Sequence, residues 1–244
     1  MWARSSLLAP KRSKYRLVAI AQPAIGAVIP WEPSPPELNL PQPRTDGSVL
    51  QVGSQIFYIG GSDGTTASAD VSVAATVQIG NFDKWTPGPA LPEPRADASV
   101  AYVAGSIYVF GGRDATGAPT DTVFSLSPDS QTGALGAWSK VDTLKLPEAR
   151  SGAGIAITPD GVLLIGGRNA HGPVATTWKT TLNSHGALGA WSPAPSLIHP
   201  HPDATALRLA PSPCLYTAGT PPGPAGAAPR GPCRAARAAG GPPA

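Results

Sequence analysis

Residues 91–114 read Leu-Pro-Glu-Pro-Arg-Ala-Asp-Ala-Ser-Val-Ala-Tyr-Val-Ala-Gly-Ser-Ile-Tyr-Val-Phe-Gly-Gly-Arg-Asp. A proline-rich turn ending in Arg leads into two short apolar runs, and the second run ends at a pair of glycines. Apolar runs of this length around a short glycine turn predict a β-hairpin. We therefore expect strands at 99–103 and 107–110, joined by a tight turn at Gly105-Ser106.

The same pattern recurs along the chain with a period near 53 residues, which indicates a structural repeat. The proline turn returns at 40–44 and 146–150 and, in a weaker form, at 197–201. Glycine pairs follow 20 residues after the first three turn leucines, at 60–61, 111–112 and 166–167. A third marker is tryptophan, at spacings of 54, 53 and 53: Trp31, Trp85, Trp138 and Trp191.

Each unit is expected to hold four short antiparallel strands. In the central unit the third strand is predicted at 122–126 and the fourth at 136–139, around Trp138. The matching strands are predicted at 48–51, 56–59, 70–75 and Trp85 in one unit, and at 153–157, 162–165, 176–182 and Trp191 in another. Four strands in about 50 residues are typical of a propeller blade, which buries both faces only when neighbouring blades stack on it.

A glycine pair after a short apolar strand, a Trp about 25 residues later and a Pro-Arg turn into the next unit resemble kelch repeats, as in the central domain of galactose oxidase. The resemblance covers about residues 15–219 and implies an all-β fold, a kelch-type β-propeller. The resemblance says little about function, because kelch propellers bind many different molecules and only some are enzymes.

The two ends of the repeat region predict half blades. Residues 15–21 followed by Trp31 resemble the third and fourth strands of a blade, and residues 204–219 resemble a first and a second strand. The expectation is three complete four-stranded blades plus two half blades. We favour an open fragment of a longer propeller over a four-bladed ring, and its open blade edges would allow self-association.

Composition and charge support this division into a body and two tails. With 28 Gly, 30 Pro and few Lys or Glu, a mainly helical fold is excluded. Residues 31–210 carry a net charge of −5, whereas the ends are basic, so no nucleic-acid surface is expected. We predict a basic disordered terminus at 1–14, blades at 15–219 and a disordered tail at 220–244. The Pro-, Ala- and Gly-rich tail is either natural or the product of a lost reading frame near Pro211.

The remaining signals say little about compartment. Cys214 and Cys233 lie near the C-terminus in no metal-type spacing. The apolar run at 17–29 is interrupted by Gln22, Pro23 and Gly26, and it is short for a bilayer span of about 20 residues. No signal peptide or membrane span is expected, and the localisation stays open.

A candidate binding rim follows from the alternation of strand direction, which places two sets of loops at one end of the blades. One set carries Asp63, Asp114 and Asn169, and the other ends in Arg44, Arg95, Arg150 and His201. Arg donors suit carboxylate or sulfate ligands. The alternative is that these Arg side chains tie one blade to the next, by bonding loop carbonyls or nearby acids. The acids in question are Asp46, Asp97, Glu93 and Glu148. The tryptophans are expected to pack between blades.

No catalytic constellation, metal site or cofactor site is expected. The four His are scattered, and galactose oxidase-type copper chemistry lacks its ligands here. Glu93 beside Arg95, or Glu148 beside Arg150, is the nearest acid–base candidate. Two hypotheses remain: a binding scaffold that recognises a protein or glycan through the loop rim, or a carbohydrate-active enzyme of the sugar-acid mutarotase type.

Overall fold

The computed structural model describes residues 23–24, 27–28, 36–78, 81–129, 131–208 and 215–218. Nearly all regular structure in these residues is β-strand, with two short 3-10 helices, η1 (Pro36–Leu38) and η2 (Asp142–Leu144). The expected half blade at 15–21 and Trp31, the two predicted tails and both cysteines lie outside the described residues. In the N-terminal region, two strands of two residues each, β1 (Pro23–Ala24) and β2 (Ala27–Val28), pair with one another.

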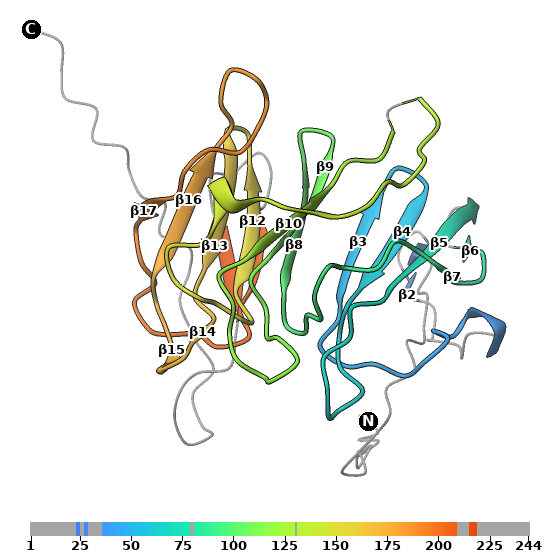
Figure 1. Ribbon diagram of the computed structural model, residues 1–244, viewed down its shortest axis with the longest axis horizontal. Coiled ribbons are helices and arrows are strands. Elements are labelled where there is room, and N and C mark those ends of the chain that lie inside the picture. The colour runs from blue at the N-terminus through green and yellow to red at the C-terminus, as the bar shows by residue number, and fades with distance from the viewer. Residues whose placement is uncertain are drawn as a thin grey trace, which may run out of the picture.

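Three antiparallel sheets form the three predicted blades (Figure 1). The first blade contains β3 (Ser48–Val52), β4 (Gln55–Ile59), β5 (Val71–Gln78), β6 (Asn81–Phe82) and β7 (Thr86–Pro87). The second blade contains β8 (Ser99–Val103), β9 (Ser106–Phe110), β10 (Val123–Leu126) and β11 (Ser139–Lys140). The third blade contains β12 (Gly154–Thr158), β13 (Gly161–Ile165), β16 (Thr177–Thr181) and β17 (Ser192–Ala194), with a small hairpin, β14 (Arg168–Asn169) and β15 (Gly172–Pro173), in one loop.

A half blade follows the third blade, as predicted. β18 (Thr205–Arg208) pairs with β19 (Leu215–Ala218), and β18 packs against β12. Each first strand of a blade lies against the first strand of the next, in the order β3, β8, β12, β18. Within the described residues no comparable contact joins β3 and β18. The all-β propeller architecture is therefore confirmed.

Strand boundaries differ from expectation at two kinds of place. The hairpin turn in the second blade is Ala104-Gly105, because Val103 pairs with Ser106 and both turn residues have positive φ, 49° and 81°. This two-residue geometry matches the twist of the flanking strands. The fourth strands begin just after each tryptophan, at 86, 139 and 192. The tryptophans stand outside the ladder and turn their rings toward the core.

The core lies between the blades. Phe57, Ile59, Val71 and Val73 of the first blade pack against the second blade. The residues of the second blade in this cluster are Ile107, Val109, Phe124, Leu126 and Trp138. A second cluster joins the second and third blades through Val103, Phe110, Val162 and Leu164, with Trp191 packed against it. Apolar burial between successive blades therefore holds the repeats together.

Candidate functional site

The loops at one end of the blades are built by the glycine pairs. Gly111 and Gly112 end β9 with φ of 57° and 93°. The N–H of Gly112 donates to the carbonyl of Arg150, in the turn that leads into the next blade, at 2.8 Å. A Cβ on Gly111 would lie 2.3 Å from that carbonyl oxygen. Glycine is therefore required here by both conformation and contact, and it brings the two repeat markers together.

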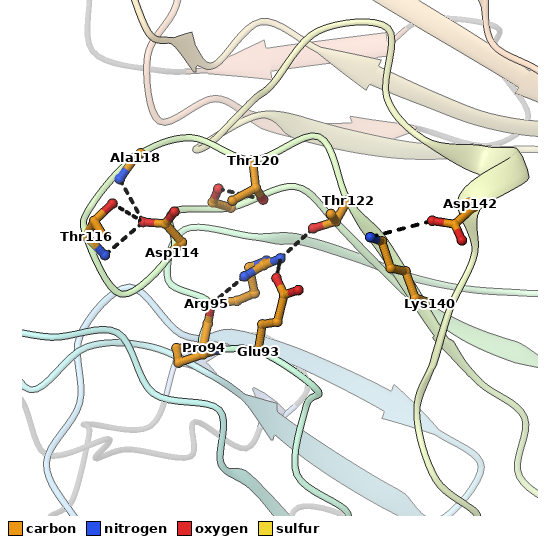
Figure 2. A network of polar contacts seen from close by, with 11 residues as sticks. Glu93, Pro94, Arg95, Asp114, Thr116, Ala118, Thr120, Thr122, Lys140 and Asp142 are labelled. Atoms are coloured by element: carbon orange, nitrogen blue, oxygen red, sulfur yellow. Dashed lines mark hydrogen bonds and ion pairs between the residues drawn. The ribbon is translucent and has the colours of Figure 1, made fainter.

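Arg95 joins two blades through its backbone and its side chain. Its N–H donates to Ser68 at 3.0 Å, and its carbonyl accepts from Gly61 at 2.8 Å, both in the first blade. Its side chain enters the second blade instead, where Nη2 donates to Glu93 at 2.6 Å and to the Thr122 hydroxyl (Figure 2). The guanidinium also lies 4.9 Å from the centre of the Phe124 ring.

Arg150 repeats this arrangement between the second and third blades. Nη1 donates to the carbonyls of Gly166 at 2.8 Å and Thr176 at 3.2 Å, and Nη2 donates to Glu148 at 2.6 Å. Burial lowers the pKa of Arg150, and its hydrogen bond with Glu148 opposes that shift. The side chains of Arg95 and Arg150 are each only 1% exposed. Both guanidinium groups therefore bond the protein itself rather than facing solvent at the rim.

Arg44 occupies the same place in the first blade with weaker contacts. Nη1 donates to the carbonyls of Gly60 and Asp70, at 3.3 Å each, and Nη2 pairs with the Asp70 carboxylate. His201 holds the fourth place, and its carbonyl accepts from Gly167 at 2.8 Å. Its Nδ1 is buried and has no hydrogen-bond partner among the described residues. Arg95, Arg150 and His201 therefore share a backbone role that joins blades, whereas the side-chain contacts at the four positions differ.

Asp63, Asp114 and Asn169 hold the shape of the loops that follow the glycine pairs. The Oδ1 of Asp63 accepts from the N–H of Thr65 at 2.8 Å, and that of Asp114 accepts from Thr116 at the same distance. Asn169 accepts from the N–H of His171 at 2.8 Å. The N–H of Thr66, followed by that of Thr65, lowers the pKa of Asp63. The hydroxyl of Thr116 is the main cause of the lowered pKa of Asp114 (Figure 2). Each side chain is thus engaged within its own loop, and the amide of Asn169 also donates to Glu148.

Charged side chains gather beside the first strands of the blades, at the same end as these loops. Asp46, Asp97 and Asp203 precede β3, β8 and β18, and each adopts the left-handed conformation, with φ of 57°, 52° and 53°. Arg113 lies between two of them, because Nε donates to Asp97 at 2.7 Å and Nη2 donates to Asp46 at 2.8 Å. Arg168 approaches Asp203 at 4.0 Å. We call these five residues the axial charge cluster.

The side chains of the axial charge cluster are partly exposed, and burial together with a neighbouring negative charge raises the pKa of one of them, Asp97. The exposed side-chain fractions are 42% for Asp46, 24% for Asp97, 35% for Arg113, 47% for Arg168 and 58% for Asp203. Burial is the largest cause of the raised pKa of Asp97, followed by the charge of Asp46, while Arg113 opposes the shift. Gly152 stands where the third blade would carry the next aspartate, and its φ is 58°. The repeat symmetry is therefore broken at the third blade.

Sequence reasoning placed Asp46 and Asp97 only as partners for the turn arginines, and it did not join them to Arg113. The available signal was an aspartate two residues after the turn Arg or His in three of the four copies. A second signal was the Arg directly after two of the glycine pairs. The structure joins these signals because each loop residue pairs with the segment before the first strand, as Arg113 does with Ala96.

The carboxylates considered for acid–base chemistry are committed to ion pairs. Glu148 accepts from Arg150 and from the amide of Asn169, and this second contact is the main reason that the pKa of Glu148 is lowered. A lowered pKa makes the carboxylate a weaker base and a poor proton donor near neutral pH. In the described part of the chain no group of three or more His, Cys, Asp or Glu could hold a metal ion.

Comparison with known proteins agrees with this geometry. The Kelch motif family matches residues 94–143. The chain is 31% identical over 122 residues to the Kelch repeat protein M-T8 of Myxoma virus (strain Lausanne), a match covering 49% of this chain and 21% of the viral protein. The solved structure of YjhT superposes with a TM-score of 0.55 at 19% identity, covering 69% of this chain and 56% of YjhT. Among the described residues, no helix is long and apolar enough to span a bilayer.

Proposed function

We propose that this chain, a kelch-repeat protein, is a scaffold without catalysis of its own that binds a partner protein through the loop rim. The rim is formed by the β4–β5, β9–β10 and β13–β16 loops together with the turns that precede β3, β8, β12 and β18. Kelch repeats commonly mediate protein interactions. The observation that carries the proposal is the axial charge cluster, in which five charged side chains from successive repeats remain partly exposed. Most other polar side chains that recur at this rim are engaged within the fold.

The cluster suits a protein partner because it offers both signs of charge over neighbouring blades. Complementary charges of this kind speed association and select partners, and they contribute less to raw affinity. Arg113 and Asp46 form a pair that is about one-third to two-fifths exposed, so a partner can exchange one of these contacts for its own. The break in symmetry at Gly152 gives the rim a unique position, as a specific binding surface requires.

The engagement of Glu93 and Glu148 by buried guanidinium groups supports a scaffold over the sugar-acid mutarotase alternative. Glu93 is half exposed, but its carboxylate bonds Arg95. Glu148 bonds both Arg150 and Asn169. An acid–base pair needs a carboxyl group that can exchange its proton near the working pH. Turnover of a sugar acid, abolished by Glu148→Gln, would contradict the scaffold proposal.

The test compares charge reversals at the two ends of the blades. The double variant Arg113→Glu, Arg168→Glu changes the rim, whereas Lys179→Glu reverses a charge that pairs with Asp160 in the β12–β13 turn, at the other end. Partners are cross-linked to the wild-type chain in cell extract, identified by mass spectrometry and then purified for calorimetry.

We expect the rim variant to weaken binding of the identified partner at least about tenfold, or ~1.4 kcal/mol, with stronger binding at low salt in the wild type. Lys179→Glu should leave the dissociation constant unchanged. Equal binding by the wild type and the rim variant, with both folded by circular dichroism, would contradict a role for the axial charge cluster.

A further inference from the structure

The face of the first blade that points away from the second blade is chemically the same kind of surface as the faces buried inside the chain. Ile56 and Tyr58 lie on this face with Trp85 in a small apolar cluster, in which Tyr58 and Trp85 are buried and Ile56 is partly exposed. Val49 on β3 is 52% exposed. Val100, at the same place in β8, packs into the core between the first two blades. A blade-like surface is therefore the natural occupant of this face.

The backbone links between successive blades end in complementary groups. The N–H of Asp97 donates to Asp46 at 2.8 Å, that of Gly152 donates to Asp97 at 2.9 Å, and that of Ala204 donates to Gly152 at 2.8 Å. Among the described residues, the N–H of Asp46 and the carbonyl of Asp203 make no comparable link. One end of the series thus presents a donor and the other an acceptor.

Two side chains in and before the half blade lack, among the described residues, the hydrogen bonds that their equivalents make in the complete blades. The hydroxyl of Ser48 donates to Ala98 at 2.6 Å, and that of Ser99 donates to Ala153 at 2.7 Å, each in the following blade. Thr205 holds this place in β18 and is exposed. His201, which stands where Arg150 bonds a third strand, keeps a buried Nδ1 without a partner in the described part of the chain.

We propose that two copies of this chain associate head to tail, with the free face of the first blade in one copy packing on the half blade of the other. The contact continues the interface already used between successive blades, with apolar burial and the same direction of hydrogen bonding. It joins two different surfaces, so it forms either a closed dimer or a longer series of copies. This inference is independent of the proposed partner at the rim.

The first test is the molar mass of the 244-residue chain in solution, measured by light scattering and by sedimentation over a range of concentrations. We expect mass to rise with concentration. Val49→Glu should raise the dissociation constant of the association at least about tenfold, because it places a charge on the free face. The matched control is Val77→Glu at the end of β5, since Val77 is 61% exposed but lies away from this face. A monomeric wild type at all concentrations would overturn the proposal.

The second test distinguishes the direction of association and does not depend on the folding of the glutamate variant. Val49→Cys and Thr205→Cys are made separately in a chain carrying Cys214→Ser and Cys233→Ser. Under mild oxidation, the mixture of the two should form a disulfide-linked dimer, whereas neither variant should do so alone. Cross-linking of Val49→Cys with itself would show a symmetric contact and refute the head-to-tail arrangement, as would the absence of cross-linking in the mixture.

Discussion

Replacing Arg150 by Ala should destabilise the joint between the second and third blades more than any other change at the turn arginines. The side chain is 1% exposed and donates to two backbone carbonyls, to the Thr176 hydroxyl and to Glu148. Alanine removes all of these donors and leaves a cavity. Glu148 is 36% exposed and keeps its contact with Asn169, so its loss of a partner contributes little.

The magnitude follows from the groups left behind. The Gly166 carbonyl loses the guanidinium donor inside the fold, and a buried group without a partner costs about 1–3 kcal/mol. The Thr176 carbonyl keeps the N–H of Gly166 as a donor, at 3.1 Å. We therefore expect Arg150→Ala to lower the free energy of unfolding by about 2–5 kcal/mol, the range for truncating a large buried side chain to alanine. Arg44→Ala is the matched control and should cost less, because its two carbonyl contacts are longer, at 3.3 Å each, and its carboxylate partner Asp70 is 63% exposed.

The assay is urea unfolding followed by tryptophan fluorescence, with hydrogen exchange of β13 and β16 amides to locate the change. Repeat proteins can unfold unit by unit, so the exchange data show whether the loss is confined to the third blade. A loss below about 1 kcal/mol for Arg150→Ala, or one no larger than that of Arg44→Ala, would show that the Arg150 side chain does not hold the second and third blades together.

Three further predictions test the turn, the tryptophan and the charge cluster. Gly53→Ala and Gly111→Ala share a φ of 57°, but only at Gly111 would the new Cβ meet a backbone oxygen, at 2.3 Å. In urea unfolding, Gly53→Ala should therefore lower the free energy of unfolding by about 1–2 kcal/mol, and Gly111→Ala should lower it clearly more. Equal losses would show that the backbone oxygen near Gly111 does not exclude a side chain. Trp138→Phe loses the Nε1 donor to the Pro89 carbonyl at 2.9 Å, so thermal melting should show a free energy of unfolding that is lower by about 1–2 kcal/mol. Because burial raises the pKa of Asp97, the folded state holds this proton more tightly than the unfolded chain, and wild-type stability falls as pH rises through that pKa. Unfolding midpoints of Asp97→Asn measured against pH should not show this fall in stability. Parallel midpoint curves for the wild type and Asp97→Asn would contradict the prediction.

The repeat made most of the fold predictable. Glycine pairs, proline turns and tryptophans mark positions where the backbone has few alternatives, so strands such as 99–103 fell at the expected residues. The fourth strands were less predictable, because they are only two or three residues long and begin after the tryptophan. A short strand at a blade edge carries little pattern of its own, and its pairing depends on its neighbour.

The candidate site was harder to predict than the fold. Sequence reasoning identified Arg44, Arg95 and Arg150 as either rim ligands or ties between blades. The hydrogen bonds of Arg95 and Arg150 place their guanidinium groups inside the protein. The residues that remain partly exposed beside the first strands, Arg113 among them, attracted less attention because each is ordinary in its local sequence.

The sequence by itself determined the period, the all-β class, the division of each unit into strands and the mildly acidic body. These properties are local, since they depend on hydrophobic alternation and on residues that permit particular backbone angles. Only the tertiary structure decided which polar side chains stay accessible. Asp46 and Arg113 are 67 residues apart in the chain, yet their side chains lie 2.8 Å apart. Such proximity arises only when one blade packs on the next, because the separation of two charges in space is set by the stacking of repeats and not by their spacing in sequence.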